Sequence, residues 1–568
     1  MGKIRRSNRS HTLWMKGFYA SANEAIYGSV WPRVKKIEKR IAKPRQGGAG
    51  DVAGSLVVFD IKTSSTEMAL LDRRPFIVTF KPRTYNVNLV EPELNQAGVV
   101  TAHAITAFGP TDNPEQVAAR PYMTGEVPYY ISPLLGATSF LTSPSVSLDN
   151  CQIQRPDVNW HLYEALCYIF CTDEVREEMF GQKTDYPRNG SDAEWHNEYR
   201  AAVGDRLWHQ FKNAYYSPML KRMCYESLGC VEGNQDYVKT ARGNFSGLFP
   251  LCLQNATLRS HTGVKNDNLF LPAGCHIEIS CQKMNPLNAM IERADENEQQ
   301  YFSPERVDCP DGTLDQGKAE GRKSQLDIRD LEVSLAYEVA ELEREISDHN
   351  FGGFFDFPIQ RINYLLPGVR HDSQTISVPE HSRLFYCAFI PDVQVNLSMR
   401  PNRRQNHLST KFSFPHALQR IRFKLTDSND LVVKDGIYEL GSARDRARSP
   451  TLRMYHESLI EENIYSGRFE DWCPQPRMSN RTLTDVQEIA GYDQAFAFLL
   501  DKFSRHLTKA SELTVDLEWA VNSPRHLYIY TWFIQQRRIT RSKNEGWKIQ
   551  VVPVSGGGVE ISPAADKA

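Results

Sequence analysis

The chain has 568 residues, which is more than one hydrophobic core usually supports, so two or more domains are expected. Its hydrophobic content of 41% with 11% aromatic residues excludes global disorder, and no apolar run reaches the roughly eighteen residues of a membrane-spanning helix. The formal net charge of −2 is unevenly distributed, because residues 1–46 contain twelve Lys and Arg against two Glu, a net charge of +10.

The basic start of the chain is predicted to be an N-terminal arm, residues 1–50, which ends in the flexible Gln46–Gly50. Between Leu13 and Ile41, aromatic residues are interspersed with basic ones, and one or two amphipathic helices are expected there. A basic arm on an acidic body indicates an anionic partner, either nucleic acid or a membrane surface, and a solvated tail is the alternative. The candidate contact residues of the arm are Lys3, Arg5, Arg6, Arg9, Lys16, Arg33, Lys35, Lys36, Lys39 and Arg40.

The cysteines and the N-terminus predict folding in a reducing compartment. The basic start is not followed by a continuous apolar stretch, so no secretory signal is expected. The eleven cysteines are scattered and form no CxxC pair, which is typical of reduced core residues. Cys167 and Cys171 lie four apart on a predicted helix, where packing in the core is favoured over a thiol site.

Beyond the arm, strand-like blocks recur in one order in the two halves of the chain. Strands are expected first at Leu56–Ile61 and Pro75–Phe80. The first half then shows a strand ending in an Asp-Asn turn, a helix and three strands: Ser139–Asn150, Leu162–Phe170, Gly247–Leu253, Cys275–Cys281 and Leu331–Glu338. The second half repeats that order in Leu418–Asp427, Met454–Glu462, Gly491–Leu500, Leu513–Trp519 and Leu527–Phe533.

The last two blocks carry the clearest strand pattern. Apolar residues alternate with polar ones from Leu513 to Trp519, and this period of two is typical of a half-buried strand. The turn-like Asn522–Pro524 separates this strand from the next, so the pair is predicted to form a closing hairpin.

The repeated order predicts an all-β fold of two consecutive jelly-roll (antiparallel β-sandwich) domains, with short helical excursions and the basic N-terminal arm. The first jelly roll is expected at residues 51–348 with long insertions at 181–243 and 292–325, and the second at 349–553, followed by a flexible tail, 554–568. The domain boundary is placed near His349, after the helix-prone Glu338–Ile346.

With these blocks in order, the chain resembles the double jelly-roll major capsid proteins of the Polinton, adintovirus and virophage group. Tyr129–Leu134 and Phe412–Pro415 depart from that group's pattern. The resemblance is carried by Val146–Asn150 before Tyr163–Leu166, by Leu271–Ser280, Asp330–Leu335 and Ile359–Ile362 before a strand ending at Val378-Pro379, and by Gly491–Phe498 and Leu513–Phe533.

The resemblance implies a structural protein of the virion. Three copies would form a pseudo-hexameric homotrimeric capsomer that tiles an icosahedral shell around a DNA genome, assembled in the nucleus or cytoplasm of a host cell. The implied partners are the chain itself, neighbouring capsomers, minor capsid or penton proteins, and genome DNA or an inner membrane through the arm. The two insertions would be tower or inter-subunit loops.

Enzymatic chemistry is not indicated by the sequence, and no cofactor or metal is expected. GxxxxGK[ST] and HExxH motifs do not occur, and His371 and His381 lie in a loop-rich stretch. Asp516 and Glu518 would share the polar face of one strand, where solvated charges are usual, although a β-sandwich glycosidase would need two such carboxylates in a cleft. The alternatives are a two-domain carbohydrate-binding or hydrolytic protein and a nucleic-acid-binding protein that is not a capsid component.

Overall fold

The structure is a computed structural model. The residues that it describes are 34–47, 55–80, 141–149, 151–154, 159–171, 273–283, 332–342, 351–391, 412–473 and 494–553 with short gaps in the last two, and isolated strands in between.

In the described residues, the first half of the chain forms two four-stranded antiparallel sheets that face each other across a buried core. One sheet, here called the β17 sheet, has the strand order β1-β17-β3-β12, and the other, the β13 sheet, has the order β11-β10-β13-β2. The strands are β1 (Val34–Ala42), β2 (Leu56–Lys62), β3 (Glu67–Phe80), β10 (Leu141–Leu148), β11 (Cys151–Gln154), β12 (Gly243–Gly247), β13 (His276–Lys283) and β17 (Glu332–Leu342).

The second half of the chain forms another such pair of sheets in its described residues. The β25 sheet has the order β18-β25-β20-β23, with β26 also paired to β25, and the β24 sheet has the order β19-β24-β21-β22. The strands are β18 (Phe351–Leu365), β19 (His371–Val378), β20 (Ser382–Pro391), β21 (Leu418–Thr426), β22 (Val432–Glu439), β23 (Phe496–Leu499), β24 (Ser511–Trp519), β25 (Leu527–Ser542) and β26 (Gly546–Val551).

The two sandwiches have the same topology. The strands of the first sandwich in chain order, β1, β2, β3, β10, β11, β12, β13 and β17, correspond one by one to β18 through β25. In both copies the first, eighth, third and sixth strands form one sheet, and the fifth, fourth, seventh and second form the other. An eight-stranded double sheet wound in this way is a jelly roll. The predicted fold class of two consecutive jelly rolls is therefore confirmed.

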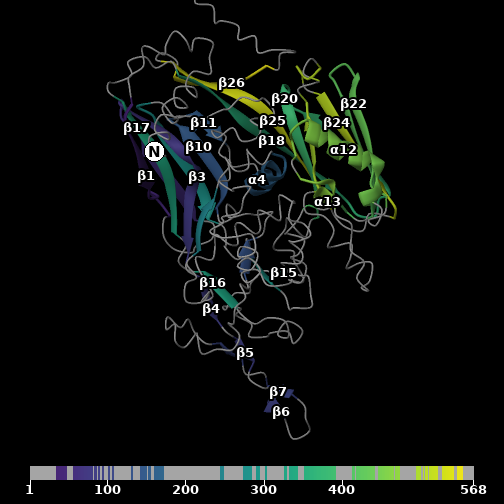
Figure 1. Cartoon of the computed structure of the whole chain (residues 1–568), viewed down its shortest axis with the longest axis horizontal. Coiled ribbons are helices and arrows are strands. Elements are labelled where there is room, and N and C mark those ends of the chain that lie inside the picture. The colour runs from purple at the N-terminus through teal and green to yellow at the C-terminus, as the bar shows by residue number, and fades with distance from the viewer. Residues whose placement is uncertain are drawn as a thin grey trace, which may run out of the picture.

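The strand connections differ between the two ends of each roll. At one end, here called the turn end, short turns join β10 to β11, β19 to β20 and β21 to β22, with positive φ at Asp149, His381 and Asp430. At the opposite end, the loop end, the long connections of the first roll leave the sandwich. Their short strands lie below the two rolls in Figure 1, on the side opposite to β26. They are β4 (Pro82–Tyr85), β5 (Val87–Leu89), β6 (Glu93–Leu94), β7 (Val100–Ala102), β8 (Ile105–Ala107), β9 (Tyr129–Ile131), β14 (Met290–Arg293), β15 (Tyr301–Phe302) and β16 (Gln325–Ile328).

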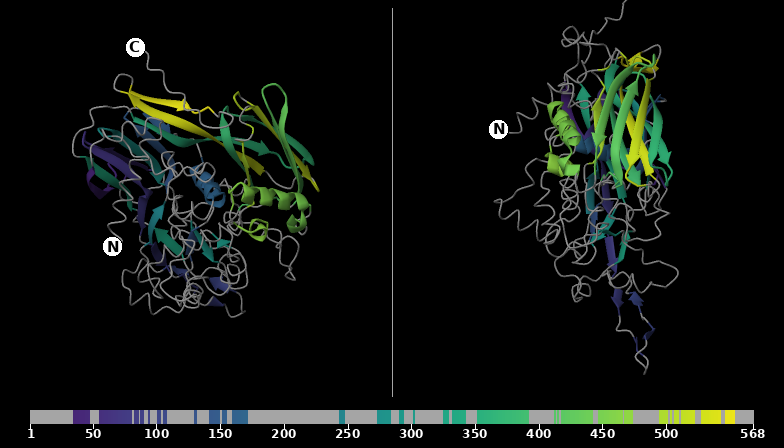
Figure 2. Two further views of the ribbon diagram at one scale, coloured as in Figure 1. Left: turned by 45° about the horizontal axis from the view of Figure 1, so that its top comes forward. Right: turned by 90° about the vertical axis from the view of Figure 1, so that its right-hand side faces the viewer.

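The described helices lie in corresponding connections. Helix α4 (Trp160–Ile169) follows β11, the fifth strand of the first roll. Helix α12 (Pro450–Glu461) follows β22, the fifth strand of the second roll, after the short helix η7 (Arg446–Arg448) and before α13 (Phe469–Trp472). Both longer helices match predicted helical blocks. Figure 2 shows α12 beside the sheets of the second roll.

The closing strands do not form the predicted hairpin. Strand β24 pairs with β19 and β21 in one sheet, whereas β25 pairs with β18, β20 and β26 in the other. The corresponding strands β13 and β17 of the first roll also lie in different sheets. The chain therefore crosses from one sheet to the other between its last two jelly-roll strands, and the predicted repeat holds while the predicted pairing is wrong.

Two helix predictions are also wrong in the described residues. Val34–Ala42, the end of the segment expected to be amphipathic helix, is strand β1, paired with β17 from Val34 to Ala42. Residues 13–33 lie outside the described residues. Glu338–Leu342, the start of the segment expected to connect the domains as a helix, belongs to strand β17. Cross-strand pairing outweighs the local helix propensity of these charged segments.

The predicted insertions fall largely outside the described residues. Of residues 181–243, only Gly243 is described, at the start of β12. Of residues 292–325, the ends of β14 and the start of β16 are described together with β15. The tail 554–568 also lies outside the described residues.

Candidate functional site

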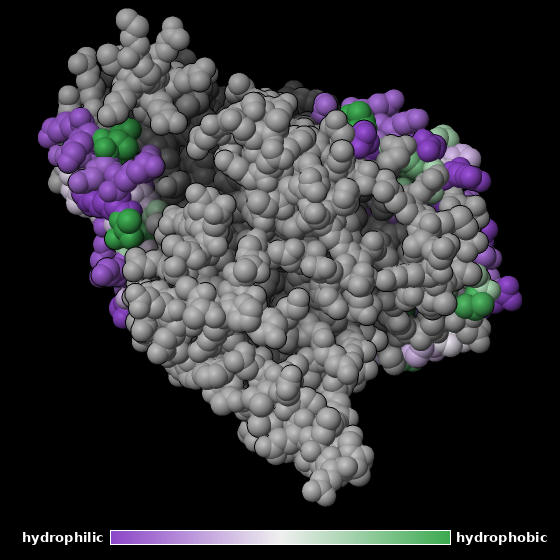
Figure 3. Space-filling view, turned by 60° about the horizontal axis from the view of Figure 1, so that its bottom comes forward, coloured by the Kyte–Doolittle hydropathy of each residue, from purple (hydrophilic) through white to green (hydrophobic). Residues whose placement is uncertain are grey.

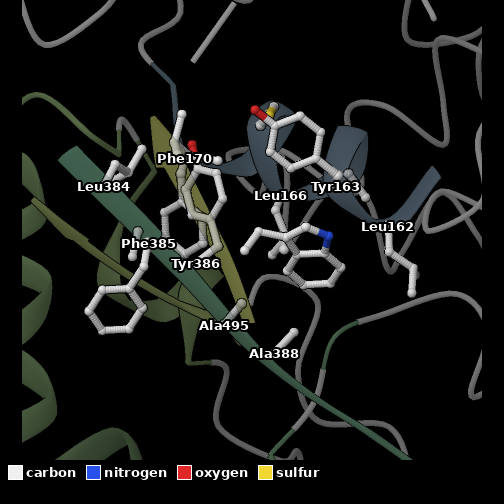
Figure 4. Packing of buried hydrophobic residues seen from close by; sticks show 14 of the residues in the cluster. Leu162, Tyr163, Leu166, Phe170, Leu384, Phe385, Tyr386, Ala388 and Ala495 are labelled. Atoms are coloured by element: carbon white, nitrogen blue, oxygen red, sulfur yellow. The ribbon is translucent and has the colours of Figure 1, made fainter. Parts of the chain in front are cut away.

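The most developed feature outside the two cores is the junction between the rolls. Helix α4 of the first roll lies between the sandwiches, against the outer face of the β25 sheet of the second roll (Figure 1). Apart from His161, whose side chain lies outside the described ones, its side chains are buried from Trp160 to Ile169. Figure 4 shows side chains of α4 directed toward strand β20.

Aromatic rings form the apolar part of this junction. On β20, Phe385 points into the second roll and stacks on Phe498 at 4.9 Å, whereas the next residue, Tyr386, points out of the roll. The ring of Tyr386 stacks on Phe170 at 5.6 Å and contacts Tyr163 of α4 at 6.3 Å. Burial raises the pKa of the Tyr386 hydroxyl well above its ordinary value, so the group stays neutral.

A single side-chain amide joins the two rolls within the apolar junction. Gln360 on β18 accepts a hydrogen bond from the backbone N–H of Asn159, the residue before α4, at 2.7 Å. The same oxygen, Oε1, accepts from the indole N–H of Trp532 on β25 at 3.1 Å. Trp532 is fully buried, so this amide satisfies an indole donor that has no access to water.

A second contact joins the rolls at the turn end. Strand β25 continues past its last residue paired to β20, Gln535, and pairs with β26 from Arg537 to Ser542. In this extension, Arg541 donates to the backbone carbonyls of Ala273 and Gly274 of the first roll, both at 3.2 Å. On β26, Trp547 donates its indole N–H to Asp149 Oδ2 at 2.6 Å. The extension therefore reaches from one roll to the turns of the other.

Four of the ten predicted arm residues lie on strand β1, where nearby carboxylates balance their charge. Arg40 donates to Glu67 of β3 at 2.8 Å, and Lys39 lies 3.5 Å from Glu338 of β17. Lys35 lies 3.8 Å from Glu341, and Lys36 lies 3.6 Å from Glu38 of the same strand. These four residues therefore form part of the jelly roll, and the carboxylates of β3 and β17 that pair with them are distant in sequence.

The remaining six predicted arm residues have no described position. Lys3, Arg5, Arg6, Arg9, Lys16 and Arg33 all lie outside the described residues.

The two carboxylates considered for glycoside hydrolysis belong to an ion-paired ladder on the outer face of the β24 sheet. Glu518 lies 2.5 Å from Arg420, and Asp516 accepts from the Ser373 hydroxyl at 2.6 Å. Arg422 lies 4.0 Å from Asp516 and is bidentate to Asp435 at 2.8 and 2.6 Å. This arrangement matches the predicted solvated strand face rather than a pair of carboxylates in a cleft.

The environments of the thiols and histidines in the described residues indicate a structural role. Cys167 and Cys171 are buried, as predicted, and burial raises the pKa of Cys275, Cys281 and Cys473 to about 12. Such thiols are poor nucleophiles near neutral pH. His371 begins β19, and His381 lies in the turn between β19 and β20. No group of three or more His, Cys, Asp and Glu suited to a metal ion occurs in the part of the chain that the structure describes.

No helix within the described ranges is both long and apolar enough to cross a membrane.

Sequence reasoning missed the junction between the rolls. The segment Leu527–Ile534, apolar except for Thr531, was a signal, because a strand buried on both faces shows such a run instead of alternation. Gln360, Trp547 and Arg541 carried no local signal, since each acts through a partner far away in the sequence.

Comparison with known proteins gave distant structural similarities. No protein-family model and no curated protein matches the chain. The chain is similar to the crystal structure of the mavirus major capsid protein, with 9% identity and a TM-score of 0.47 over 92% of this chain and 94% of that one. It is also similar to the chain of the Sputnik virophage structure, with 11% identity and a TM-score of 0.47 over 94% and 92%. The Faustovirus major capsid protein gives 8% identity and a TM-score of 0.38 over 89% and 91%.

Proposed function

We propose that this chain is a major capsid protein that forms pseudo-hexameric homotrimers, and that these capsomers tile an icosahedral shell around a DNA genome. The observation that carries the proposal is the duplication of the whole jelly roll, with one strand order in both copies. Three copies of a two-roll chain present six similar rolls, so a threefold assembly has a nearly sixfold outline. Such an outline lets one building block tile a closed surface.

The junction between the rolls supports a structural role. Both faces of strand β20 are buried, one against the core of its own roll and the other against α4. Gln360 and the Trp547–Asp149 contact add directed hydrogen bonds to the apolar junction. A large apolar interface with directed hydrogen bonds fixes the two rolls in one relative orientation, as a tile requires.

Other partners follow from the same proposal. Neighbouring capsomers and minor capsid or penton proteins would contact the outside of the trimer. Lys3, Arg5, Arg6, Arg9, Lys16 and Arg33 would face genome DNA or an inner membrane, which they would bind through charge without sequence preference. The mature protein would reside in the virion after assembly in the nucleus or cytoplasm of the host cell.

Light scattering on the purified full-length protein tests this function. One chain has a mass of 64.9 kDa, and we expect trimers of about three chain masses or larger shells. Electron micrographs of the trimer should show a six-lobed outline. A protein that stays monomeric at high concentration and binds glycans contradicts the proposal. We expect the wild type to show no glycan hydrolysis. If it does hydrolyse glycans, loss of that activity in the Asp516→Asn and Glu518→Gln variants would support the hydrolytic alternative.

A further inference from the structure

The two rolls differ in how completely their corresponding surfaces are covered. The described side chains of helix α4 are buried, whereas α12, its counterpart in the second roll, buries Leu452, Tyr455 and Leu459 and exposes its opposite side. The central strands β20 and β25 are buried on both faces over most of their length, whereas β1, the edge strand of the corresponding β17 sheet, is largely exposed from Lys35 to Ile41. Helix α4 and the β25 sheet cover each other at the junction within the chain. Their counterparts, α12 and β1, have no such cover in the described part of the chain.

The exposed side of α12 is apolar and acidic. Met454 is 68% exposed and Ile460 is 42% exposed, although both are large apolar residues. Glu457 and Glu461 are exposed beside them, and spacings of three, four and seven place these residues on neighbouring positions of one helix side. We call Met454, Glu457, Ile460 and Glu461 the helix face.

The outer side of β1 has the complementary character. Arg40 is paired with Tyr337, whose ring packs against the core, so Ile37, Lys39 and Ile41 lie on the opposite side of β1, and Lys35 precedes them at the irregular pairing between Val34 and Lys36. On this outer side, Ile37 is 39% exposed and Ile41 is 64% exposed, between the basic Lys35 and Lys39. We call these four residues the strand face. Figure 3 shows isolated apolar side chains of this kind within an otherwise hydrophilic described surface.

The strand face lies on the counterpart of β18, the strand that binds the start of α4, and α4 itself packs against Tyr386 on β20 of the same sheet. Gln360, which binds the start of α4, lies on β18 opposite Trp532 of β25. Strand β18 corresponds to β1 and β25 corresponds to β17, where Lys39 lies opposite Glu338. The Lys39–Glu338 pair is surface-exposed, so the ion pair itself contributes little to stability.

We propose that the helix face of one copy docks on the strand face of a second copy, repeating between chains the contact that α4 makes within the chain. Met454 and Ile460 cover Ile37 and Ile41, while Glu457 and Glu461 lie near Lys35 and Lys39. The contact is head-to-tail, because the two faces lie on different rolls at opposite sides of the molecule in Figure 1. A head-to-tail contact generates a ring when its rotation closes, and three copies close a ring of six rolls.

This inference rests on the proposed trimer and deepens it, and two full-length variants test it. The helix variant carries Met454→Glu and Ile460→Glu, and the strand variant carries Ile37→Glu and Ile41→Glu. Leu431→Glu is the matched control, because Leu431 is 55% exposed on the second roll and belongs to neither face. Sedimentation velocity should show loss of the trimer to single chains for each variant alone and an intact trimer for the control.

Mixing the two variants provides the decisive measurement. Each variant keeps one intact face, so a head-to-tail contact yields a dimer containing one chain of each variant and nothing larger. This dimer also shows that both variants are folded. If both variants still form trimers, the inference is wrong, while the proposed function stands. Mixing that gives no mixed dimer also overturns it, whereas a wild type that is itself monomeric removes the proposed function.

Discussion

Trp547 and Asp149 lie 398 positions apart in the sequence, yet the indole N–H of Trp547 donates to Asp149 Oδ2 at 2.6 Å. Asp149 occupies the turn between β10 and β11 with a φ of 49°, and its other oxygen accepts the backbone N–H of His276 at 2.9 Å. One carboxylate thus shapes a turn of the first roll and fastens β26 of the second roll to it.

Replacing Trp547 with Phe should destabilise the protein by about 1 to 3 kcal/mol, because the aromatic ring remains while a hydrogen bond to a charged acceptor is lost. Urea unfolding monitored by circular dichroism measures the free energy. Asp149→Asn alone should cost less, since Asn also tolerates a positive φ and keeps an acceptor. In the double variant the two costs should not add. Additive costs would show that the two side chains do not interact.

Replacing Gln360 with Met should cost about 2 to 4 kcal/mol, because the backbone N–H of Asn159 and the indole N–H of Trp532 lose their shared acceptor. Met has a similar volume, so loss of packing contributes little. Gln374→Met is the matched control: its half-buried amide contacts Asp372 and Asn363 near the surface, and its replacement should cost under about 1 kcal/mol. Equal losses in the two variants would exclude a special role for Gln360.

Replacing Tyr455 with Phe should loosen α12, the helix of the proposed inter-chain contact. The Tyr455 hydroxyl accepts the backbone N–H of Ala497 at 2.7 Å and donates to the carbonyl of Ala497 at 3.0 Å. Its removal leaves buried backbone groups without a partner, so we expect a cost of about 2 kcal/mol in chemical denaturation. Leu431→Ala, at an exposed position outside both proposed contact faces, serves as the control and should leave the stability almost unchanged. A Tyr455→Phe variant as stable as this control contradicts the prediction.

The sequence predicted the strands of each roll better than their partners. The alternation from Leu513 to Trp519 revealed β24, because every second residue of a half-buried strand faces the core and is apolar. The same pattern does not say which strand lies alongside, so β24 and β25 were paired incorrectly. Strand β1 was mistaken for a helix because the carboxylates that pair with Lys35, Lys39 and Arg40 lie on β3 and β17, far away in the sequence. The junction residue Gln360 was invisible for the same reason: its partners are Asn159 and Trp532.

The Arg40–Glu67 pair predicts a pH dependence of stability. The hydrogen bond from Arg40 holds the pKa of Glu67 below its ordinary value of 4.5, so the folded state favours the ionised carboxylate. The contribution of the pair is therefore present above the unfolded pKa and is lost as the pH falls through the lower folded pKa. Because both side chains are partly exposed, it should stay under about 1 kcal/mol.

Chemical denaturation of the wild type and Arg40→Gln between pH 3 and pH 7 measures this effect. The difference in unfolding free energy should be constant above about pH 5 and shrink toward acid pH. Lys36→Gln is the control and should show a smaller difference, because the side chain of Lys36 is 63% exposed and lies near Glu38 of its own strand. A difference for Arg40→Gln that grows toward acid pH would contradict the assigned ion pair.

Two N-terminal deletions should have different consequences, because the basic segment contains a strand of the first roll. The sequence alone predicts that removing residues 1–46 leaves the trimer folded and impairs shell closure or cargo packaging. The structure restricts this expectation to residues 1–33, since β1 begins at Val34 and pairs along β17. Deleting 1–46 removes β1 and leaves β17 as an open sheet edge, which favours aggregation.

Thermal unfolding and size-exclusion chromatography separate the two deletions. The chain without residues 1–33 should keep the trimer and the unfolding temperature of the full chain. Its affinity for DNA should fall and should depend less on salt concentration. The chain without residues 1–46 should unfold at a lower temperature and aggregate. If both deletions are equally stable, β1 contributes nothing to the first roll. If removing 1–33 abolishes the trimer, the arm makes contacts between the chains of the trimer and is not primarily an anion-binding segment.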